Sequence, residues 1–294
     1  MIDYNKFVEN SRKWLSQYVQ DNHLQSLIIG VSGGIDSTIT CAIASPVCKE
    51  LNIPLIGRSL PAHSNNPEEN RTAQLVGKAF CDDFKKVAIE RIFGIVADEI
   101  ELNEGKMTPL QLGNIKARLR MIYLYNLASI HRGCVLDTDN RTEHELGFWT
   151  IHGDVGDLNL GIINLWKTEV YKLAEYILTS YEILAIRTEQ IGLAIQALKQ
   201  SIDLTPTDGN GVKDGGDCAQ FELDNYEQVD DVLKTMYFDE NHAWDCPNEK
   251  GDSEYIRLID SYNEQGVDKV MMLHQNSMFK REHLPIYPKL DNLV

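Results

Sequence analysis

The chain is organised around the stretch Ser26-Leu27-Ile28-Ile29-Gly30-Val31-Ser32-Gly33-Gly34-Ile35-Asp36-Ser37-Thr38. Its apolar run, residues 27–31, has the length of a buried strand and stops at Ser32-Gly33-Gly34. Helix-compatible sequence resumes at Asp36-Ser37 and continues to Leu51. The stretch therefore predicts a strand, a tight glycine loop and a helix in direct succession.

The predicted loop has the chemistry of a phosphate-binding site. Two adjacent glycines let the backbone turn so that successive N–H groups converge on an anion, and the start of the following helix adds more. The hydroxyls of Ser32, Ser37 and Thr38 can donate further hydrogen bonds. Asp36 suits such a site when a cation lies between it and the phosphates, and Mg²⁺ is the natural candidate.

The loop follows neither G-x-x-x-x-G-K-[ST] nor G-x-G-x-x-G. It resembles the S-G-G-x-D-S loop of the ATP pyrophosphatase (PP-loop) family, whose members cleave ATP between the α and β phosphates to adenylate a substrate. A simple glycine turn in an α/β protein is the alternative interpretation of Gly33-Gly34 alone. The flanking Ser32, the following Asp36-Ser37 and the apolar strand favour phosphate binding.

Composition narrows the class of protein. A chain of 294 residues can bury one α/β core, and its net charge of −16 argues against a nucleic-acid or membrane-surface partner. The six cysteines form no C-x-x-C pair, which argues against a zinc or thioredoxin-like site. The sequence shows no signal-peptide core and no bilayer-spanning run. We expect a soluble, cytoplasmic protein.

The remaining pattern alternates short apolar runs with amphipathic segments, which is typical of a parallel sheet covered on both faces. We expect an α/β fold with a Rossmann-like parallel sheet, in one domain over 1–294, followed by a helical C-terminal extension. The polar, glycine-rich segment 201–224 predicts a mobile substrate loop, and 238–252 a possible insertion. Further strands are expected at 53–57, 84–89 and 134–136, and helices at 4–22, 67–81, 108–132, 168–178, 183–199, 226–236 and 253–265.

Two polar segments are candidate site elements. Asp137-Thr138-Asp139-Asn140-Arg141-Thr142-Glu143 follows the strand at 134–136, where ligands of open α/β sheets bind. It could simply cap a helix through Asn140 or Thr142, but its three carboxylates also favour a metal. Basic residues of the helix 108–132, including Lys116 and Arg120, could be a solvated face, yet in so acidic a chain they favour an anion-facing role.

Taken together, several blocks resemble the motifs of NAD synthetase, in order and spacing, over nearly the whole chain. The blocks are 32–37, Gly113-Asn114-Ile115-Lys116-Ala117-Arg118-Leu119-Arg120-Met121, 138–143, Gly147-Phe148, Gly153-Asp154, Leu165-Trp166-Lys167-Thr168-Glu169-Val170, Pro206-Thr207-Asp208-Gly209 and Lys280-Arg281. The resemblance implies an adenine nucleotide alpha hydrolase-like fold and a homodimer. It also implies amidation of nicotinic acid adenine dinucleotide (deamido-NAD) through an adenylate, with ATP as co-substrate and Mg²⁺ as cofactor.

The resemblance also implies residue roles. The catalytic group would be Asp36, Glu143 and Lys167, with Asp36 and Glu143 as the Mg²⁺ ligands. ATP would be bound by Gly30, Val31, Ser32, Gly33, Gly34, Ile35, Asp36, Ser37, Thr138, Lys167 and Thr207. Deamido-NAD would be bound by Arg118, His152, Asp157, Lys280 and Arg281.

The sequence departs from the family pattern near the dinucleotide. Asp137 stands where the family usually has Gly, which we expect to add a negative charge near the nucleotide. Ile151 replaces a substrate-binding lysine, with His152 as a partial substitute. Asp157 matches the family's aspartate when one residue is skipped, and Phe279 replaces a histidine.

About 25 residues precede the first predicted strand, too few for a glutaminase domain, so free ammonia is the expected nitrogen donor. Two alternatives remain. Another PP-loop adenylating enzyme, GMP synthetase-like or tRNA-modifying, would use the same loop, although the absence of a catalytic cysteine pair and of a basic surface counts against the tRNA-modifying thiolase. A non-catalytic nucleotide-binding module would bind ATP without releasing pyrophosphate.

Overall fold

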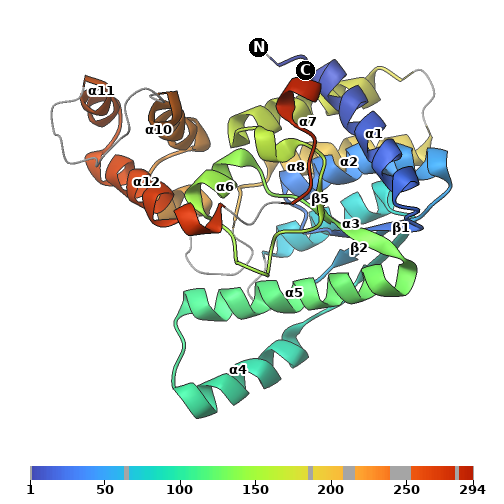
Figure 1. Ribbon diagram of the computed structural model, residues 1–294, viewed down its shortest axis with the longest axis horizontal. Coiled ribbons are helices and arrows are strands. Elements are labelled where there is room, and N and C mark those ends of the chain that lie inside the picture. Colours follow the sequence, from blue (N-terminus) through green and yellow to red (C-terminus); the bar gives the residue numbers. More distant parts are fainter. Residues whose placement is uncertain are drawn as a thin grey trace.

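The computed structural model describes residues 2–62, 66–184, 188–207, 216–238, 253–281 and 285–293. Within these ranges, five parallel strands form one sheet in the order β3-β2-β1-β4-β5 (Figure 1). The strands are β1 Ser26–Gly30, β2 Leu55–Ser59, β3 Asp83–Lys86, β4 Gly133–Asp137 and β5 Leu158–Asn159. The expected α/β fold with a parallel sheet is confirmed.

The strand order places a topological switch point beside β1. The chain proceeds from β1 outward through β2 to β3, then returns to β4 on the other side of β1. Ile29 of β1 pairs with Gly57 of β2 and with Leu136 of β4, so the ends of β1 and β4 lie side by side. Crevices outside such strand ends are where open α/β sheets bind ligands.

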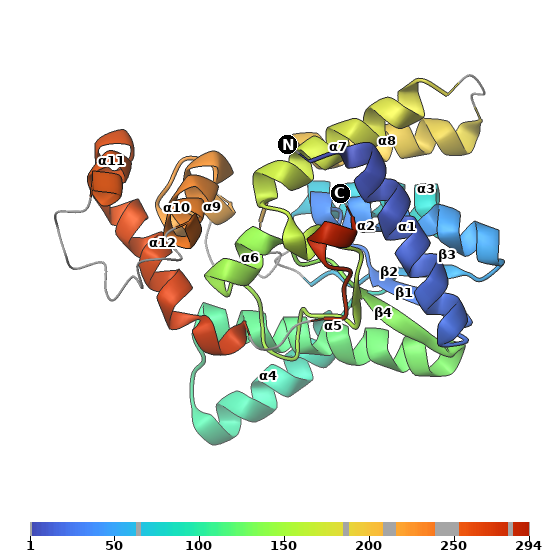
Figure 2. The same ribbon diagram turned by 45° about the horizontal axis from the view of Figure 1, so that its top comes forward.

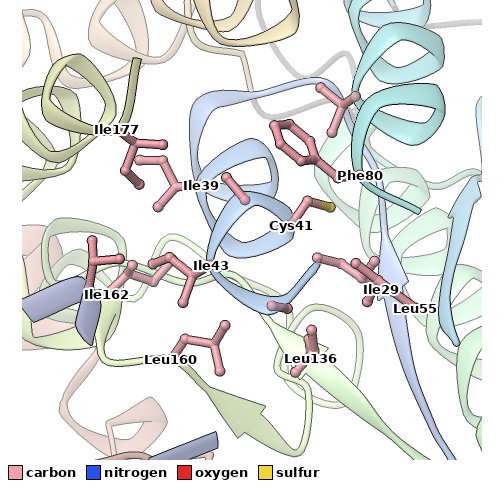
Figure 3. Packing of buried hydrophobic residues seen from close by; sticks show 14 of the residues in the cluster. Ile29, Ile39, Cys41, Ile43, Leu55, Phe80, Leu136, Leu160, Ile162 and Ile177 are labelled. Atoms are coloured by element: carbon pink, nitrogen blue, oxygen red, sulfur yellow. The ribbon is translucent and has the colours of Figure 1, made fainter. Parts of the chain in front are cut away.

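Helices cover both faces of the sheet because alternate strand residues point to opposite sides. Ile29 and Leu136 join the larger apolar cluster with α2 Ile35–Leu51, and Figure 3 shows Ile39 and Ile43 pointing from α2 into it. Ile28 and Val135 face the smaller cluster against α5 Pro109–His131. The first face also carries α1 Tyr4–Asp21, α3 Pro67–Phe80, α7 Lys167–Glu182 and α8 Glu189–Asp203, and α4 Glu90–Glu104 packs against α5.

The C-terminal extension forms a helical lobe to one side of the sheet (Figure 2). Its helices are α9 Asp217–Phe221, α10 Tyr226–Phe238, α11 Ser253–Ser261 and α12 Glu264–Asn276. They share an apolar cluster that includes Phe221, Val229 and Met271 and that reaches Leu146 at the end of α6 Arg141–Leu146. The lobe is therefore packed directly on the segment that follows β4.

The chain then returns to the sheet. After the short 3-10 helix η2 Met278–Lys280, Ile286 forms a parallel bridge with Leu158. Two further 3-10 turns are η1 Ile162–Asn164 and η3 Leu290–Asn292. Near the end of the chain, the side chain of Asn10 in α1 donates to the carbonyl of Leu293 (3.1 Å). Of the described helices, none combines the length and the apolar character required to cross a bilayer.

Several element boundaries differ from the sequence-based expectation. The helix α4 was not predicted; Ala97 is its one buried side chain, so it lacks a strong apolar stripe. The helix α8 begins at Glu189 instead of residue 183, because the Thr188 hydroxyl caps it by accepting from the N–H of Ile191. The expected helix 253–265 is two helices, since Asn263 caps the start of α12.

The expected loop 201–224 is only partly irregular. Residues 201–203 end α8, and α9 lies inside the segment. Residues 208–215 of this segment lie outside the described part of the chain, as does nearly all of the possible insertion 238–252. The mobility expected for 201–224 stays a prediction.

Candidate active site

The loop between β1 and α2 has the shape that a phosphate-binding loop requires. Gly33 has a φ of +94°, and a Cβ there would lie 2.3 Å from the carbonyl oxygen of Glu69 in α3. No other residue fits this position without strain and collision. Gly34 is the N-cap of α2 and provides no side-chain cap, so the first N–H groups of the helix can receive an anion.

Hydroxyl groups of the loop itself and of the neighbouring helix α8 hold this loop in place. Ser32 Oγ lies 3.1 Å from Ser37 Oγ and accepts from the N–H of Gly34 (3.2 Å). Ser201, near the end of α8, contacts Thr38 Oγ1 (2.7 Å) and donates to the Gly33 carbonyl (3.3 Å). The loop is therefore ordered by the fold itself, with α3 and α8 as its supports.

The segment after β4 places a second acidic group beside this loop. Asn140 and Glu143 form a reciprocal capping box at the start of α6, with N···O distances of 3.1 and 3.2 Å. The same Asn140 donates from Nδ2 to Asp36 Oδ1 (2.9 Å). The expected capping role of Asn140 is therefore confirmed, and the same residue also contacts Asp36 of the loop.

Lys167 joins the two carboxylates. Its Nζ lies 2.6 Å from Asp36 Oδ2 and 2.9 Å from Glu143 Oε1, and the side chain is 3% exposed. Burial would lower the pKa of Lys167, but the two carboxylates outweigh it and raise that pKa well above its ordinary value. Burial raises the pKa of Glu143 to about 7, although Lys167 lowers it. One ammonium faces two carboxylates, so the cluster retains a negative charge when all three are ionised.

These residues suit a nucleotide-bound magnesium ion. The described residues contain no group of three or more His, Cys, Asp or Glu side chains that could hold a metal alone. Mg²⁺ commonly takes one or two carboxylates and completes its shell with substrate phosphates and water. Asp36 and Glu143 meet at one point, beside the loop where phosphates are expected. The donor set therefore fits Mg²⁺ that arrives with ATP.

One cavity of about 410 Å³ is lined by this charged cluster and, in another part that we call the polar chamber, by Asn114 of α5, Trp149, Thr150 and Asp154 of the loop after α6, and Lys280. Thr150 donates from its hydroxyl to Asn114 Oδ1 (2.8 Å) and from its N–H to Asp154 Oδ2 (2.6 Å). Hydrogen bonds therefore connect the polar side chains of this chamber.

Lys280 closes this chamber from the C-terminal side. Its Nζ donates to the carbonyls of Gly147 (2.6 Å) and Trp149 (2.5 Å) and lies 5.5 Å from the centre of the Trp149 ring. Burial lowers the pKa of Lys280, while Asp154 raises it. Both hydrogen bonds are accepted by neutral carbonyls, so the positive charge of the Lys280 ammonium remains able to attract an anionic ligand.

Most of the residues expected to bind ATP or metal meet at this cavity. Its lining includes Gly30, Val31, Ser32, Gly34, Ile35, Asp36, Ser37, Thr138, Glu143, Lys167, Thr207 and Lys280. Gly33 instead lies against α3. The Thr207 hydroxyl donates to the carboxylate of Glu69 at the cavity wall. The structure therefore brings the two carboxylates, the lysine and the loop together.

Four residues expected to bind the dinucleotide do not line the main cavity. Arg118 donates from Nε to the Ile151 carbonyl (3.2 Å) and borders a smaller cavity of about 280 Å³, which shares Asn114 with the first. His152 follows Ile151 in the same loop and has a φ of +59°. The other two, Asp157 and Arg281, lie elsewhere in the fold.

Asp157 and Arg281 contact other parts of the protein. Asp157 accepts from the Tyr125 hydroxyl (2.9 Å) and from the N–H of Val135 (3.0 Å). Arg281 donates to the carbonyls of Glu145 (3.1 Å) and His274 (2.6 Å), which joins α12 to α6. The motif match gave the positions of these two residues in the sequence. It did not determine the directions of their side chains.

Sequence reasoning gave no role to Asn114, Thr150 and Asp154, although Asn114 lies within the motif 113–121 and Asp154 within the motif Gly153-Asp154. Thr150 lies in no motif, and its spacing of four residues from Asp154 carries no distinctive signal in a loop. Arg120, a candidate for an anion-facing role, does line the main cavity, and its Nε donates to the Leu60 carbonyl (3.0 Å).

Asp137 is fully buried and is not among the residues that line the main cavity. Its carboxylate accepts from the N–H of Gly156 (2.9 Å), Nδ2 of Asn159 (2.6 Å) and the N–H of Asp139 (3.2 Å). Burial raises the pKa of Asp137 to about 6, against the lowering effect of these donors. The side chain ties the loop after residue 154 to β4. Its effect on a bound nucleotide stays a prediction.

Comparison with known proteins decides the family. A model of the NAD synthase family matches residues 7–284. The chain belongs to the NAD synthase family. Its relatives include the NH(3)-dependent NAD(+) synthetase of Pyrococcus furiosus, which is 28% identical over 281 residues, covering 95% of this chain and 94% of that protein.

Solved structures of the NAD synthase type share the fold. The NMN synthetase from Francisella tularensis superposes with a TM-score of 0.71 at 21% identity, covering 99% of this chain and 100% of that one. The NH3-dependent NAD synthetase from Campylobacter jejuni gives a TM-score of 0.66 at 21% identity, covering 98% and 100%. The chain therefore has the same fold as these two proteins.

Replacing Asp137 with the family's usual glycine is expected to destabilise the protein. Asp137→Gly leaves three buried donors without an acceptor, which costs roughly 2–4 kcal/mol in the free energy of unfolding. Urea unfolding measures the loss. Lys86→Gly, at the exposed end of β3, is the control for the backbone effect of glycine, about 0.5–1 kcal/mol. Equal losses in both variants would contradict the role assigned to the Asp137 carboxylate.

Proposed function

We propose that the protein is an ammonia-dependent ligase that amidates deamido-NAD to NAD, with ATP as co-substrate. The observation that carries this function is the single cavity that joins the phosphate loop and its charged cluster to the polar chamber at Asn114 and Lys280. A triphosphate and the carboxylate it activates can therefore lie in contact. The relatives named NH(3)-dependent NAD(+) synthetase support the same reaction.

The reaction has two bond-forming steps. The nicotinate carboxylate attacks the α-phosphorus of ATP, an acyl–phosphate bond forms, the bond between the α and β phosphates breaks, and pyrophosphate leaves. Ammonia then attacks the acyl carbon, the new C–N bond replaces the bond to AMP, and one proton is released. Both steps depend mainly on position and on stabilising the charge that develops on phosphate oxygens.

The residues in the phosphate-binding part of the cavity have separate roles in these steps. The N–H groups at the start of α2 and the hydroxyls of Ser32 and Ser37 hold the phosphates. Lys167, placed between Asp36 and Glu143, orients the two carboxylates and supplies positive charge next to the leaving phosphates. Asp36 and Glu143 would hold Mg²⁺, which would further neutralise the phosphate charge when bound. Thr138 and Thr207 lie on the cavity wall where they can contact the nucleotide.

The dinucleotide is proposed to extend from the main cavity toward the smaller one. Asn114 borders both, and Arg118 borders the smaller cavity, so a long ligand can pass from one to the other along α5. Lys280 faces the acid to be activated. Asp157 and Arg281 support the site through their contacts with β4 and with α6.

A second candidate substrate is the corresponding mononucleotide. The Francisella tularensis protein named NMN synthetase matches this chain over 99% of its length. In addition, Ile151 stands where the family has a lysine that binds the dinucleotide. Both observations favour testing nicotinic acid mononucleotide as an alternative acid in the same reaction.

The function is tested by analysing products by mass spectrometry. With deamido-NAD, ATP, Mg²⁺ and ammonium, we expect NAD, AMP and pyrophosphate in equal amounts, and no comparable rate when glutamine replaces ammonium. An equimolar mixture of the mononucleotide and deamido-NAD measures the preference directly as the ratio of the two amides. ATP binding without pyrophosphate release from either acid would contradict the ligase function.

Neutral replacements of the two carboxylates should abolish turnover without unfolding the protein. Asp36→Asn and Glu143→Gln keep the shapes of the side chains but remove charge that holds Mg²⁺ and Lys167, so kcat should fall by roughly 100-fold or more. Pyrophosphate release and thermal unfolding are measured together. Glu182→Gln, at the exposed end of α7, is the control and should keep full activity. An active Glu143→Gln enzyme would refute the metal assignment.

We also propose a homodimer through the outer face of α4 and α5. Large apolar side chains are exposed on both helices, which lie next to one another in Figure 1. They are Ile92, Ile95, Leu102, Ile122 and Ile130, with exposed fractions of 49–81%. Apolar side chains gathered in this way commonly mark a surface that a partner covers.

Sedimentation measures whether this face joins two copies. The wild-type mass should be near twice 33.4 kDa, and the double variant Ile95→Glu/Ile122→Glu should shift it to a single copy, since buried charge opposes association. Ile183→Glu, equally exposed beyond α7, is the control and should leave the mass unchanged. A double variant that stays dimeric places the contact elsewhere.

A reducing compartment such as the cytoplasm is the proposed location. The described cysteines Cys41, Cys48, Cys81, Cys134 and Cys218 are free thiols. Burial raises the pKa of the Cys48 thiol to about 12, which keeps it protonated and unreactive. Free thiols of this kind are usual in reduced intracellular proteins.

A further inference from the structure

A buried carboxylate from the C-terminal lobe reaches the starts of both α6 and α7. Asp230 of α10 is 1% exposed. Its Oδ1 accepts from the hydroxyl of Thr142 (2.5 Å), and its Oδ2 accepts from the N–H of Thr168 (2.9 Å). Thr142 immediately precedes Glu143, and Thr168 immediately follows Lys167. Asp230 therefore contacts the neighbours of two site residues at once.

The Thr142 hydroxyl links these helices through two hydrogen bonds. It accepts from the backbone N–H of Lys167 (2.8 Å) and donates its own hydrogen to Asp230. Both Thr142 and Asp230 are almost completely buried, so water cannot replace either bond. The N-cap of α7, Trp166, provides no side-chain cap, and Thr142 and Asp230 fill that role from other helices.

We propose that Asp230 is a positioning residue that fixes α6 and α7 at the separation which lets Lys167 meet Asp36 and Glu143. The inference rests on the proposed function, since that function assigns Lys167 and Glu143 to the phosphates. Lys167 is the first residue of α7 and Glu143 lies in the first turn of α6. The 2.9 Å contact between their side chains therefore depends on where the two helices begin.

The surroundings of Asp230 indicate that its carboxylate serves to fix the separation of α6 and α7. Val229, Val232 and Leu233, its neighbours on α10, are buried in the apolar cluster of the lobe, which can pack without a charge. Burial raises the pKa of Asp230, and the donors Thr142 and Thr168 lower it. A buried charge is costly unless its hydrogen bonds are satisfied. Hydrogen bonds with directional geometry specify a helix separation that apolar packing alone leaves loose.

Three substitutions separate position from packing. Asp230→Asn keeps the shape and can still accept from Thr168, but its amide cannot accept from Thr142 at the same time. Thr142→Val keeps the shape and removes the hydroxyl, whereas Thr142→Ser keeps the hydroxyl. We expect kcat to fall by roughly 10- to 100-fold in Asp230→Asn and Thr142→Val, because small misplacements of catalytic groups cost this much. Thr142→Ser should stay within about 3-fold of wild type.

A control in the same lobe tests whether lost stability alone reduces activity. Tyr255→Phe removes the hydrogen bond from the Tyr255 hydroxyl to Asp268 (2.8 Å), which joins α11 to α12 away from the site. Its melting temperature should fall while its kcat and KM stay at wild-type values. In Asp230→Asn, the fall in kcat should persist at temperatures where the variant is fully folded, and KM for deamido-NAD should change little.

Calorimetric titration with Mg²⁺ and a non-hydrolysable ATP analogue separates this inference from the function. Weaker binding in Asp230→Asn and Thr142→Val, restored in Thr142→Ser, supports the inference even if the wild-type protein makes no NAD, which would overturn the function alone. An active wild type whose Asp230→Asn variant keeps its kcat and its affinity for the analogue overturns the inference. So does a Thr142→Ser variant as impaired as Thr142→Val.

Discussion

A buried ammonium between two carboxylates is the interaction on which the site depends. Lys167 comes from α7, Asp36 from α2 and Glu143 from α6, so the contact joins three elements that are far apart in the sequence. Removing charges from water is costly, and the attraction between them compensates only when the geometry is good. The loops after β1 and β4 and the start of α7 must therefore be placed accurately, and much of the polar structure around them serves that placement. Asn140 caps α6 and holds Asp36, Ser201 holds the phosphate loop, and the lobe contributes Asp230.

The parallel sheet provides the frame for this arrangement. Because β1 and β4 are neighbours although more than a hundred residues separate them, the glycine loop and the acidic segment meet at one edge. The carboxyl ends of the strands face the crevice, and the helices that follow present their N-termini to it. The partial charges of these N–H groups and the buried ammonium of Lys167 act locally, so the net charge of −16 has little influence on this crevice at such short range.

Local patterns in the sequence predicted the parts of the structure that local physics determines. The strand at β1, the glycine loop, the proline-started helices α3 and α5 and the polar segment after β4 all follow from residues close together in the chain. The charged cluster was expected because a motif placed Asp36, Glu143 and Lys167 in known roles. Side-chain direction was beyond such reasoning: Asp157 and Arg281 matched motif positions, yet they bond to β4 and α6. Asp230 gave no signal at all, because within 226–236 it is one polar residue on an amphipathic helix, and its partners are 62 and 88 residues away.

Residues of the single helix α5 border both cavities. Asn114 and Arg120 border the larger cavity, Gln111 and Arg118 border the smaller one, and Asn114 belongs to both. A helix of 23 residues is about 35 Å long and nearly inextensible, so these groups keep fixed intervals along its axis. The residues that border the two cavities alternate along the helix, so both cavities are bounded by the same turns of α5. A displacement of this helix would therefore change the shape of both cavities together.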